Sequence, residues 1–575
     1  MRGGGEGKVV VQHHDRGRKE CTSEDGEACS LTCRLTDDTL LIVFSLFSTR
    51  QLLMSAALVC RRWCRLARTY VVRAIDPPRY SLHSCPWGSL GAKFVMQLAE
   101  RHSSTAEVLN LHGLTEISGP QIATLVQMMP KLTDLTVVGC QGLLSTHLDG
   151  LVGALPVGLE RLDLHLDHLL GSRLCSSMGS VSPSSLLVTD RFADALARRC
   201  TALRDLNLEN ACTLSERGIG ILTKCFPELT ALSLQSPLLG WSDVQTIFSG
   251  CQRLKRFSLV SPHLQLHSGR RPGGRWNAGM PRQALHLARS MPPSLSSLRL
   301  YSAPHESIPL EGKMTITLIT EKGVQLEELH LQSRFQSTWQ TVSVWCPSLR
   351  CLDLSHSSRS AHTFTEVDEV VLEGALQLMT RLERLALPTA TDDILRAVGK
   401  HCPLLVELRF QGHESQSKLL PRLPVTDRGV VAIAEHCPFL RVLSLAGCRN
   451  VTASSARALA FHCQMLEVLH LTSVSQMSDE GVELLMKNNW LTVLDVLGCA
   501  RITKAFVQFL VRQFTKSPER LRLRVLAVSS ALKVGAAKEF RDIAAAHPRL
   551  DIRVGESGMS WDGFVNARPL LSDCW

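Results

Sequence analysis

The chain has 575 residues, of which 45% are hydrophobic, and a formal net charge of +10. The length exceeds one average globular domain, and the chain contains no apolar run long enough to predict a membrane span. The positive charge gathers in two segments, residues 35–80 and 261–290, rather than along one face. This distribution disfavours a general nucleic-acid surface.

Residues 1–34 are Gly-rich, charged and without periodicity, which predicts a disordered tail. They do not begin with an apolar segment, so we expect no signal peptide and a cytoplasmic or nuclear location. Residues 35–75 form a compact apolar block whose spacing fits three short helices. A block this small buries little core alone, so it should pack on the following domain or on a partner chain.

The block 35–75 resembles the F-box. The most specific part of the resemblance is the segment 57–63, Ala-Leu-Val-Cys-Arg-Arg-Trp, and the apolar run 40–44 also matches. Thr36 stands where the family usually has Pro. The resemblance implies the substrate-recognition subunit of an SCF-type ubiquitin ligase, whose catalytic residues belong to other subunits.

In that family the F-box binds the Skp1 adaptor, which links to a cullin and a RING subunit. The alternative for each matching residue is a structural role within the three helices. The residues that match the Skp1 contacts or their support are Leu35, Leu40, Leu41, Phe44, Leu58, Val59 and Trp63.

Residues 76–104 contain three Pro and then the amphipathic run from Lys93 to Arg101, which predicts a linker and a capping helix. From residue 105 to 554 the pattern Leu-x-x-Leu-x-Leu occurs about 15 times, commonly every 25 to 27 residues. Such a period predicts an α/β leucine-rich-repeat solenoid, each unit giving one strand and one helix. We expect a horseshoe with parallel strands on its concave face and helices outside.

The repeats are interrupted at residues 167–188, 261–289 and 412–424, which are rich in Ser, Gly, Pro and His and predict inserted loops. The second insertion holds five Arg, and Arg clusters can bind phosphate or acidic motifs. A disordered basic loop is the simpler interpretation. Residues 555–575 carry no period and are expected to form a tail that is loose or folds back onto the solenoid.

A short motif opens several of the expected helices. Ser215, Thr426 and Ser478 can each cap a helix through the hydroxyl, and the acid that follows suits the positive end of the helix dipole. The helices should end near Cys-Pro pairs such as 402–403 and 437–438, because Pro disfavours helical geometry in the preceding residue.

Most of the 20 Cys are predicted to be core residues rather than disulfide partners or zinc ligands. Many recur at fixed repeat positions, where Cys acts as a small hydrophobic residue. Metal binding is the alternative, but the close pairs Cys29 and Cys33, and Cys60 and Cys64, do not have the Cys-x-x-Cys spacing. The repeats thus resemble the cysteine-containing leucine-rich repeats that accompany F-boxes.

One residue in each strand, between the last two apolar positions, should point to the open face because side chains alternate across a strand. Charged residues there are the best candidates for pairing with a protein substrate, and the alternative for each is a merely solvated side chain. These candidates are Asp163, Arg299, His330, Asp353, Arg409, His470 and Asp495.

The sequence contains no phosphate-binding Gly-rich loop, nucleophile elbow or zinc-protease motif. We therefore expect no enzymatic activity, no catalytic residue, no cofactor and no metal. The alternative to a ligase subunit is a repeat protein that acts as a scaffold or inhibitor and uses the N-terminal helices only as a cap.

Overall fold

The computed structural model divides into two compact units, Met1–Arg73 and Ala74–Trp575, which we call the N-terminal unit and the repeat unit. None of the described helices is long and apolar enough to cross a membrane. The structure describes residues 36–37, 39–40, 62–63, 66, 73–75, 91–112, 114, 116–140, 142–164, 188–209, 213–236, 238–261, 286–301, 325–331, 342–354, 369–387, 390–410, 425–487, 491–516, 522–546 and 550–555.

A parallel sheet of 17 strands runs through the repeat unit, and each strand pairs with the next one in the chain. The fold is therefore the predicted leucine-rich-repeat solenoid. The strands are β1 (Ala74–Ile75), β2 (Val108–Asn110), β3 (Asp134–Thr136), β4 (Arg161–Asp163), β5 (Asp205–Leu208), β6 (Ala231–Gln235), β7 (Arg256–Val260), β8 (Ser297–Tyr301), β9 (Glu328–Leu331), β10 (Cys351–Asp353), β11 (Arg384–Ala386), β12 (Glu407–Arg409), β13 (Val442–Ser444), β14 (Val468–His470), β15 (Val493–Asp495), β16 (Val525–Ser529) and β17 (Asp551–Gly555).

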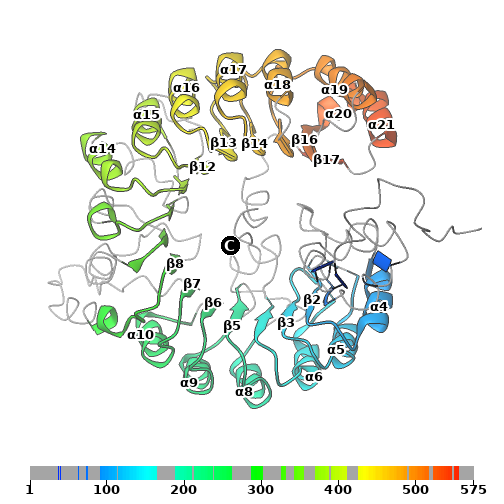
Figure 1. Cartoon of the computed structure of the whole chain (residues 1–575), viewed down its shortest axis with the longest axis vertical. Helices are drawn as coiled ribbons and strands as arrows, with labels where there is room; N and C mark the ends of the chain where they lie inside the picture. The colour runs from blue at the N-terminus through cyan, green and yellow to red at the C-terminus, as the bar shows by residue number, and fades with distance from the viewer. Residues whose placement is uncertain are drawn as a thin grey trace, which may run out of the picture. The chain divides into compact units, whose positions relative to one another are not determined.

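The helices form a second layer. In the repeat unit the strands lie along the inner side and the helices along the outer side (Figure 1). Successive helices contact one another, as α15, α16 and α17 do. The helices are α4 (Gly91–His102), α5 (Gly119–Gln127), α6 (Leu148–Ala154), α8 (Asp190–Arg199), α9 (Glu216–Cys225), α10 (Trp241–Gly250), α14 (Glu369–Leu378), α15 (Asp392–His401), α16 (Asp427–His436), α17 (Ala453–His462), α18 (Asp479–Met486), α19 (Lys504–Lys516), α20 (Ser530–Gly535) and α21 (Ala537–Ala546), with a short 3-10 turn at Ser145–His147.

The core lies between the two layers. The middle apolar residues of the strands stand in register, as Leu443, Leu469 and Leu494 do. From Ile75 on β1 to Leu526 on β16 these side chains are at most 2% exposed. No single repeat can bury such a row, so neighbouring repeats stabilise one another.

Most of the described cysteines of the repeats belong to this core, as predicted; Cys225, at the end of α9, is exposed. Cys437 donates from Sγ to the carbonyl of Cys402 at 3.5 Å, and Cys463 donates to the carbonyl of Cys437 at 3.7 Å. Burial raises the pKa of the Cys437 and Cys463 thiols to about 12. The buried cysteines that stand three residues before the first apolar position of a repeat strand pattern, or three residues after the last, are Cys140, Cys200, Cys251, Cys346, Cys402, Cys437, Cys448, Cys463 and Cys499.

The Asp of the repeat motif links consecutive helices. Asp392, at the start of α15, accepts hydrogen bonds from the Thr426 N–H (2.8 Å), the Thr426 hydroxyl (2.6 Å) and the Gly429 N–H (3.1 Å) at the start of α16. Asp427 accepts the N–H and hydroxyl of Thr452 in the same way, at 2.8 and 2.7 Å. The carboxylate therefore caps the next helix as well, satisfying N–H groups that have no partner within that helix.

The predicted hydroxyl caps are only partly confirmed. Ser215 and Thr426 accept from the N–H groups of Arg217 and Arg428, both at 3.2 Å. Ser478 makes no side-chain cap, so the prediction is wrong there. The predicted helix ends are confirmed, because α15 and α16 stop at the residue before Cys402 and Cys437.

The described part of the N-terminal unit is helical at residues 37, 39–40, 62–63 and 66. The Thr39 N–H donates to the Thr36 hydroxyl at 3.3 Å, so Thr36 precedes a helical turn at the position where the F-box family usually has Pro. Arg62 donates from Nε to Asp37 Oδ1 at 2.6 Å, which joins two segments 25 residues apart.

The sheet has one strand more at each end than the leucine pattern predicted: β1 lies before the predicted range 105–554, and β17 lies at the end of that range. Ala74 and Ile75, assigned from sequence to the N-terminal block, pair with Val108 and Leu109 as β1. The sheet therefore has 17 strands rather than about 15, because β1 and β17 lack the leucine pattern. The capping helix predicted in residues 76–104 corresponds to α4. Residues 1–34, 556–575 and most of the three insertions lie outside the described residues.

Candidate protein-interaction surface

The open face of the sheet, opposite the helices, carries two rows of side chains. The middle apolar residue of each strand faces the helices, so the residues before and after it face the other way. The residue after it makes the second row, which is the row predicted above. The residue before it makes the first row, which from β3 to β12 reads Asp134, Arg161, Asp205, Ala231, Arg256, Ser297, Glu328, Cys351, Arg384 and Glu407.

Charges alternate along the start of the first row. Arg161 lies 3.6 Å from Asp134 and 3.7 Å from Asp205, and Arg256 lies 2.9 Å from Asp205. The Arg256 side chain is 61% exposed and that of Arg161 is 39% exposed. Ion pairs with an Arg this exposed add little to stability, and the two Arg side chains are accessible to a bound protein.

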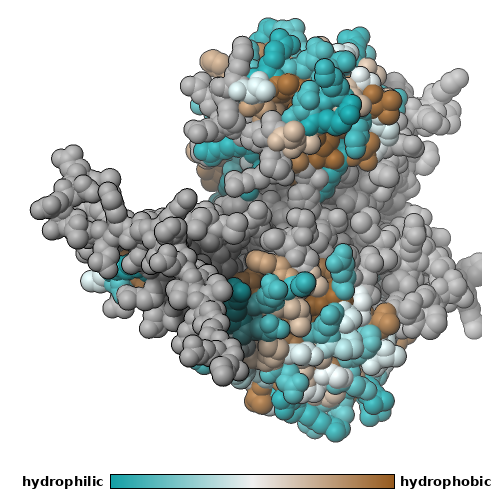
Figure 2. Space-filling view, turned by 90° about the vertical axis from the view of Figure 1, so that its right-hand side faces the viewer, coloured by the Kyte–Doolittle hydropathy of each residue, from teal (hydrophilic) through white to brown (hydrophobic). Residues whose placement is uncertain are grey.

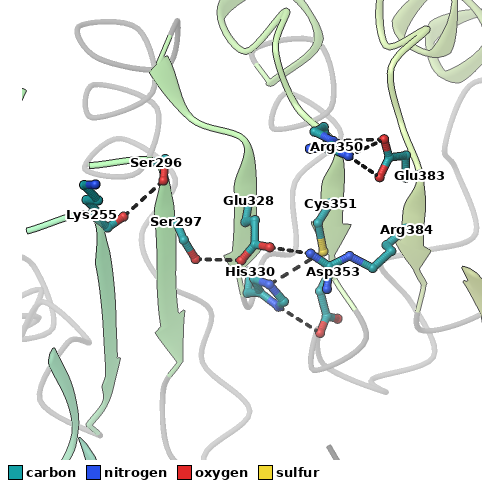
Figure 3. A network of polar contacts seen from close by, with 10 residues as sticks. All are labelled: Lys255, Ser296, Ser297, Glu328, His330, Arg350, Cys351, Asp353, Glu383 and Arg384. Carbon is teal, nitrogen blue, oxygen red and sulfur yellow. Dashed lines mark hydrogen bonds and ion pairs between the residues drawn. The ribbon is translucent and has the colours of Figure 1, made fainter. Parts of the chain in front are cut away.

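A denser polar network follows on β8 to β11 (Figure 3). Glu328 accepts the Ser297 hydroxyl at 2.9 Å and forms an ion pair with Arg384 across the strand between them. Burial alone would raise the pKa of the Glu328 carboxyl, but Arg384, Ser297 and nearby cations hold it below its ordinary value. Glu328 is therefore a paired carboxylate at neutral pH, and it neutralises the partly buried Arg384 guanidinium.

Three residues beside Glu328 have the order of a nucleophile, base and orienting acid. His330 Nδ1 lies 3.2 Å from Asp353 Oδ2, and Cys351 Sγ lies 3.7 Å from His330 Nε2 (Figure 3). Burial and Arg299 lower the pKa of His330, and burial raises the pKa of Cys351 to about 12. The thiol thus donates to a neutral imidazole and stays protonated, which argues against a catalytic nucleophile.

The first row changes character at β13. From there it is apolar, and Val442, Val468, Val493 and Val525 are between 1% and 6% exposed. We call these four residues the valine row. They pair in register across β13 to β16, on the face opposite the leucine core.

The predicted substrate contacts of the second row divide into two groups. Asp163, His330 and Asp495 are only 1%, 8% and 2% exposed, so the expectation of a solvent-facing contact is wrong for these three. The other four, Arg299, Asp353, Arg409 and His470, are partly buried, and whether they contact a substrate stays a prediction.

Internal hydrogen bonds satisfy the buried carboxylate of Asp495. Its Oδ1 accepts the Leu497 N–H at 2.9 Å, and its Oδ2 accepts the Thr472 hydroxyl. Asn110 and Asn207 in the same row accept the N–H two residues ahead, at 3.0 and 3.1 Å. Short polar side chains here thus bond to the end of their own strand instead of reaching outward.

The sequence reasoning missed the first row altogether. Strand alternation places the residue before the middle leucine on the same face as the residue after it, so the rule that gave the second row also gives the first. The alternation of Asp134, Arg161 and Asp205 was readable from this rule.

The predicted Skp1-binding residues are only partly within the described part of the chain. Leu40 is fully buried, which suits support of the helices rather than a contact face, and Trp63 is half-buried. Leu35, Leu41, Phe44, Leu58 and Val59 lie outside the described residues.

The remaining surface is mixed. Hydrophilic residues cover much of the described surface on the side shown in Figure 2, with apolar residues between them. Leu404, Phe439 and Met465, each two residues after a core cysteine, are 46%, 51% and 45% exposed. Apolar residues exposed at equivalent places in three successive repeats give the kind of surface on which proteins pack.

Comparison with known proteins agrees with the fold. A family model described as Leucine Rich repeat matches residues 436–460. No curated protein matches the chain by sequence. A chain of the "Crystal structure of Rad7 and Elc1 complex in yeast" is 18% identical with a TM-score of 0.43, covering 63% of this chain and 88% of that one.

A chain of the "Crystal structure of TLR13-ssRNA13 complex" is 13% identical with a TM-score of 0.29, covering 79% of this chain and 62% of that one. At these identities and TM-scores neither likeness carries a functional argument. The polar open face, built on a repeat fold, supports a role in protein interaction.

Proposed function

We propose that the chain recruits a protein substrate to an SCF-type ubiquitin ligase. The N-terminal unit would bind a Skp1-like adaptor, and through it a cullin and a RING subunit, while the repeat unit holds the substrate. The observation that carries the proposal is the F-box-like segment 57–63, whose Arg62 pairs with Asp37 at the start of the same block. Residues 35–73 of that block belong to a compact unit distinct from the repeat unit.

The substrate surface that fits this role best is the charged start of the first row. Arg161, Asp205 and Arg256 are accessible enough to pair with an incoming protein, whereas Asp163 and Asp495 are not. Catalysis would then be a matter of position: bound substrate reaches a high effective concentration beside ubiquitin activated on other subunits. Such a role suits a cytoplasmic or nuclear location.

Co-purification of Skp1 tests the adaptor role. We expect the full chain to capture Skp1, and Leu58→Glu together with Val59→Glu to abolish capture, because charges replace apolar contacts. Val534→Glu is the matched control, since Val534 is 78% exposed on α20. Circular dichroism should show that all three chains are folded.

Capture of Skp1 by the double variant, or by none of the chains, would favour the scaffold interpretation. The substrate surface is tested separately with Arg256→Glu, which leaves the N-terminal unit intact. We expect this variant to retain Skp1 but to lose proteins that the unmodified chain enriches when the proteasome is blocked.

A further inference from the structure

The exposed apolar side chains of the repeat unit gather on one of its two rims. Among the described residues, eleven large apolar side chains are exposed, and eight of them lie at the end of a helix or in the turn that follows it. Each of these turns leads into a strand, and parallel strands begin at the same edge of a sheet. The eight therefore share one rim. The other three are Leu238, before α10 on the opposite rim, Val534 on α20 and Val554 on β17.

Seven of the eight follow one another on five successive repeats, those that lead into β10 to β14. The helices α14, α15, α16 and α17 contact one another in turn, so these residues form a row along the rim (Figure 1). We call the row the apolar rim, and its members are Val344, Trp345, Leu378, Leu404, Phe439, Phe461 and Met465.

The repeat fold does not require apolar residues at these places. Leu404, Phe439 and Met465 each stand two residues after a buried helix-end residue. In earlier repeats the same position holds Lys131, Glu228 and Arg253, which are exposed as well. Charged side chains thus suit the position, and the apolar rim is a property of the five repeats alone.

We propose that the apolar rim joins two copies of this chain into a symmetric dimer, with a two-fold axis crossing the row at Leu404. At roughly half exposure, seven large side chains present about 700 Å² of apolar surface, near the ~800 Å² that each partner contributes to a standard interface. The largest apolar patch of a typical monomer is only about 300–600 Å². The inference concerns the repeat unit and does not depend on Skp1 binding.

The row is complementary to itself about this axis. The row runs in opposite directions in the two copies, so Leu378 of one copy lies opposite Phe439 of the other. The two apolar residues at the β10 end of the row then meet the two at the β14 end. Large apolar side chains therefore face one another along the whole row, and their contact removes apolar surface of both copies from water.

Two exposed charges fit the same axis. Arg381 holds the position of Leu404 in the repeat of α14, and Glu435 lies near the end of α16. Neither side chain forms an ion pair among the described residues. The axis exchanges these two repeats, so the Arg381 guanidinium of each copy can reach the Glu435 carboxylate of the other. The dimer would hold this ion pair twice.

Other charges beside the row are neutralised within the chain. Lys400, in the repeat that the axis crosses, lies 2.6 Å from Glu373. Arg350 donates two hydrogen bonds of 2.9 Å to the carboxylate of Glu383 on the adjacent repeat. These charges do not oppose a second copy. They also disfavour an anionic membrane as the partner, since membrane surfaces attract unpaired cations beside apolar residues.

Sedimentation velocity of the full chain over a range of concentrations tests the proposal. We expect a monomer–dimer equilibrium, and Phe439→Glu should weaken dimerisation at least about tenfold, because it places a carboxylate in an apolar interface. Leu238→Glu is the matched control, since Leu238 is 53% exposed on the opposite rim and Phe439 is 51% exposed. The control should dimerise like the unmodified chain. Circular dichroism should show that both variants are folded.

A charge exchange tests the position of the axis. Arg381→Glu and Glu435→Arg should each weaken dimerisation about tenfold, because like charges then meet across the axis. A chain with both substitutions should recover most of the loss. A chain that stays monomeric, equal losses for Phe439→Glu and Leu238→Glu, or a double variant no better than the single ones would overturn the proposal. A monomer that binds anionic vesicles unless Phe439 is replaced would also overturn it and assign the apolar rim to a membrane surface.

Discussion

The first row of the open face has two regions on one backbone. From β3 to β12 its side chains are largely charged, pair with one another and in part reach solvent, as Arg161 and Arg256 do. From β13 to β16 they are four valines with at most 6% exposure. The strand register and the leucine core are the same in both regions. The repeats thus fix the positions of the side chains. The identity of the first-row residues determines what each region can bind.

The largest effect should come from placing a charge in the valine region. Val525→Asp buries a carboxylate without a partner, and we expect it to lower the free energy of unfolding by about 3 kcal/mol. Val108 holds the same position on β2 and is half-buried. Val108→Asp should therefore lower the free energy of unfolding by less than about 1 kcal/mol. Urea denaturation of both variants measures the difference. Equal losses would mean that Val525 is no better shielded from water than Val108.

Breaking one ion pair in the charged region should lower the free energy of unfolding by somewhat less than Val525→Asp does. Glu328→Ala leaves the Arg384 guanidinium, only 19% exposed, without its main counter-charge, and we expect a loss of about 2 kcal/mol. Adding Arg384→Met should recover part of that loss, because the unpaired charge is removed with its partner. A double variant less stable than the sum of the two single variants would contradict this account of the pair.

Acid should loosen the charged region before the valine region. The pKa of Glu328 lies below its ordinary value when folded, so the stability that it gives is complete above the ordinary pKa and is lost as pH falls. The pKa of His330 is also lowered, by burial and Arg299, so the unfolded chain gains a proton below about pH 6.5 before the folded chain does.

The His330 shift therefore makes β9 to β11 less stable at about pH 5.5 than at pH 7, and the Glu328 shift adds to the loss only below the ordinary carboxyl pKa. Amide hydrogen exchange, corrected for the intrinsic pH dependence, should show this on β9 to β11 more than on β13 to β15. His330→Asn should remove the part of the change that occurs near pH 6. An equal change in both regions would show that the network is not its source.

The smallest effect is expected at the exposed end of the row. Arg256→Ala removes an ion pair whose Arg is 61% exposed, and the loss of stability should be no more than about 0.5 kcal/mol. Thermal denaturation at low and high salt should differ little between the variant and the unmodified chain. A loss above 1 kcal/mol would mean that this pair supports the fold rather than remaining open to a partner.

The leucine spacing predicted the sheet well because one position in each strand has no alternative to burial. Leu443, Leu469 and Leu494 carry the period, and the structure aligns them. The end strands were missed because β1 and β17 keep an apolar middle residue, Ile75 or Ile552, without the flanking leucines. An end strand pairs with a single neighbour, so it can form without all of the leucines of the Leu-x-x-Leu-x-Leu pattern.

The candidate surface was harder to predict. Alternation alone tells which way Asp163 and Asp495 point, but their exposure depends on what else lies on the face and on local hydrogen bonds such as that of Asp495 to Leu497. The Asp caps between helices were also out of reach, because Asp392 and Thr426 are 34 residues apart in sequence. Contacts between repeats follow from stacking, which no single repeat reveals.

The core cysteines can report local unfolding of individual repeats. Cys200, Cys251, Cys402, Cys437 and Cys463 are fully shielded, and each sits in a different repeat. A thiol reagent can modify one of them only while its own repeat is transiently open, so pulse-labelling followed by peptide mass analysis would chart local unfolding along the chain without any engineered probe. Cys225, which is exposed at the end of α9, would label at once and calibrate the reaction.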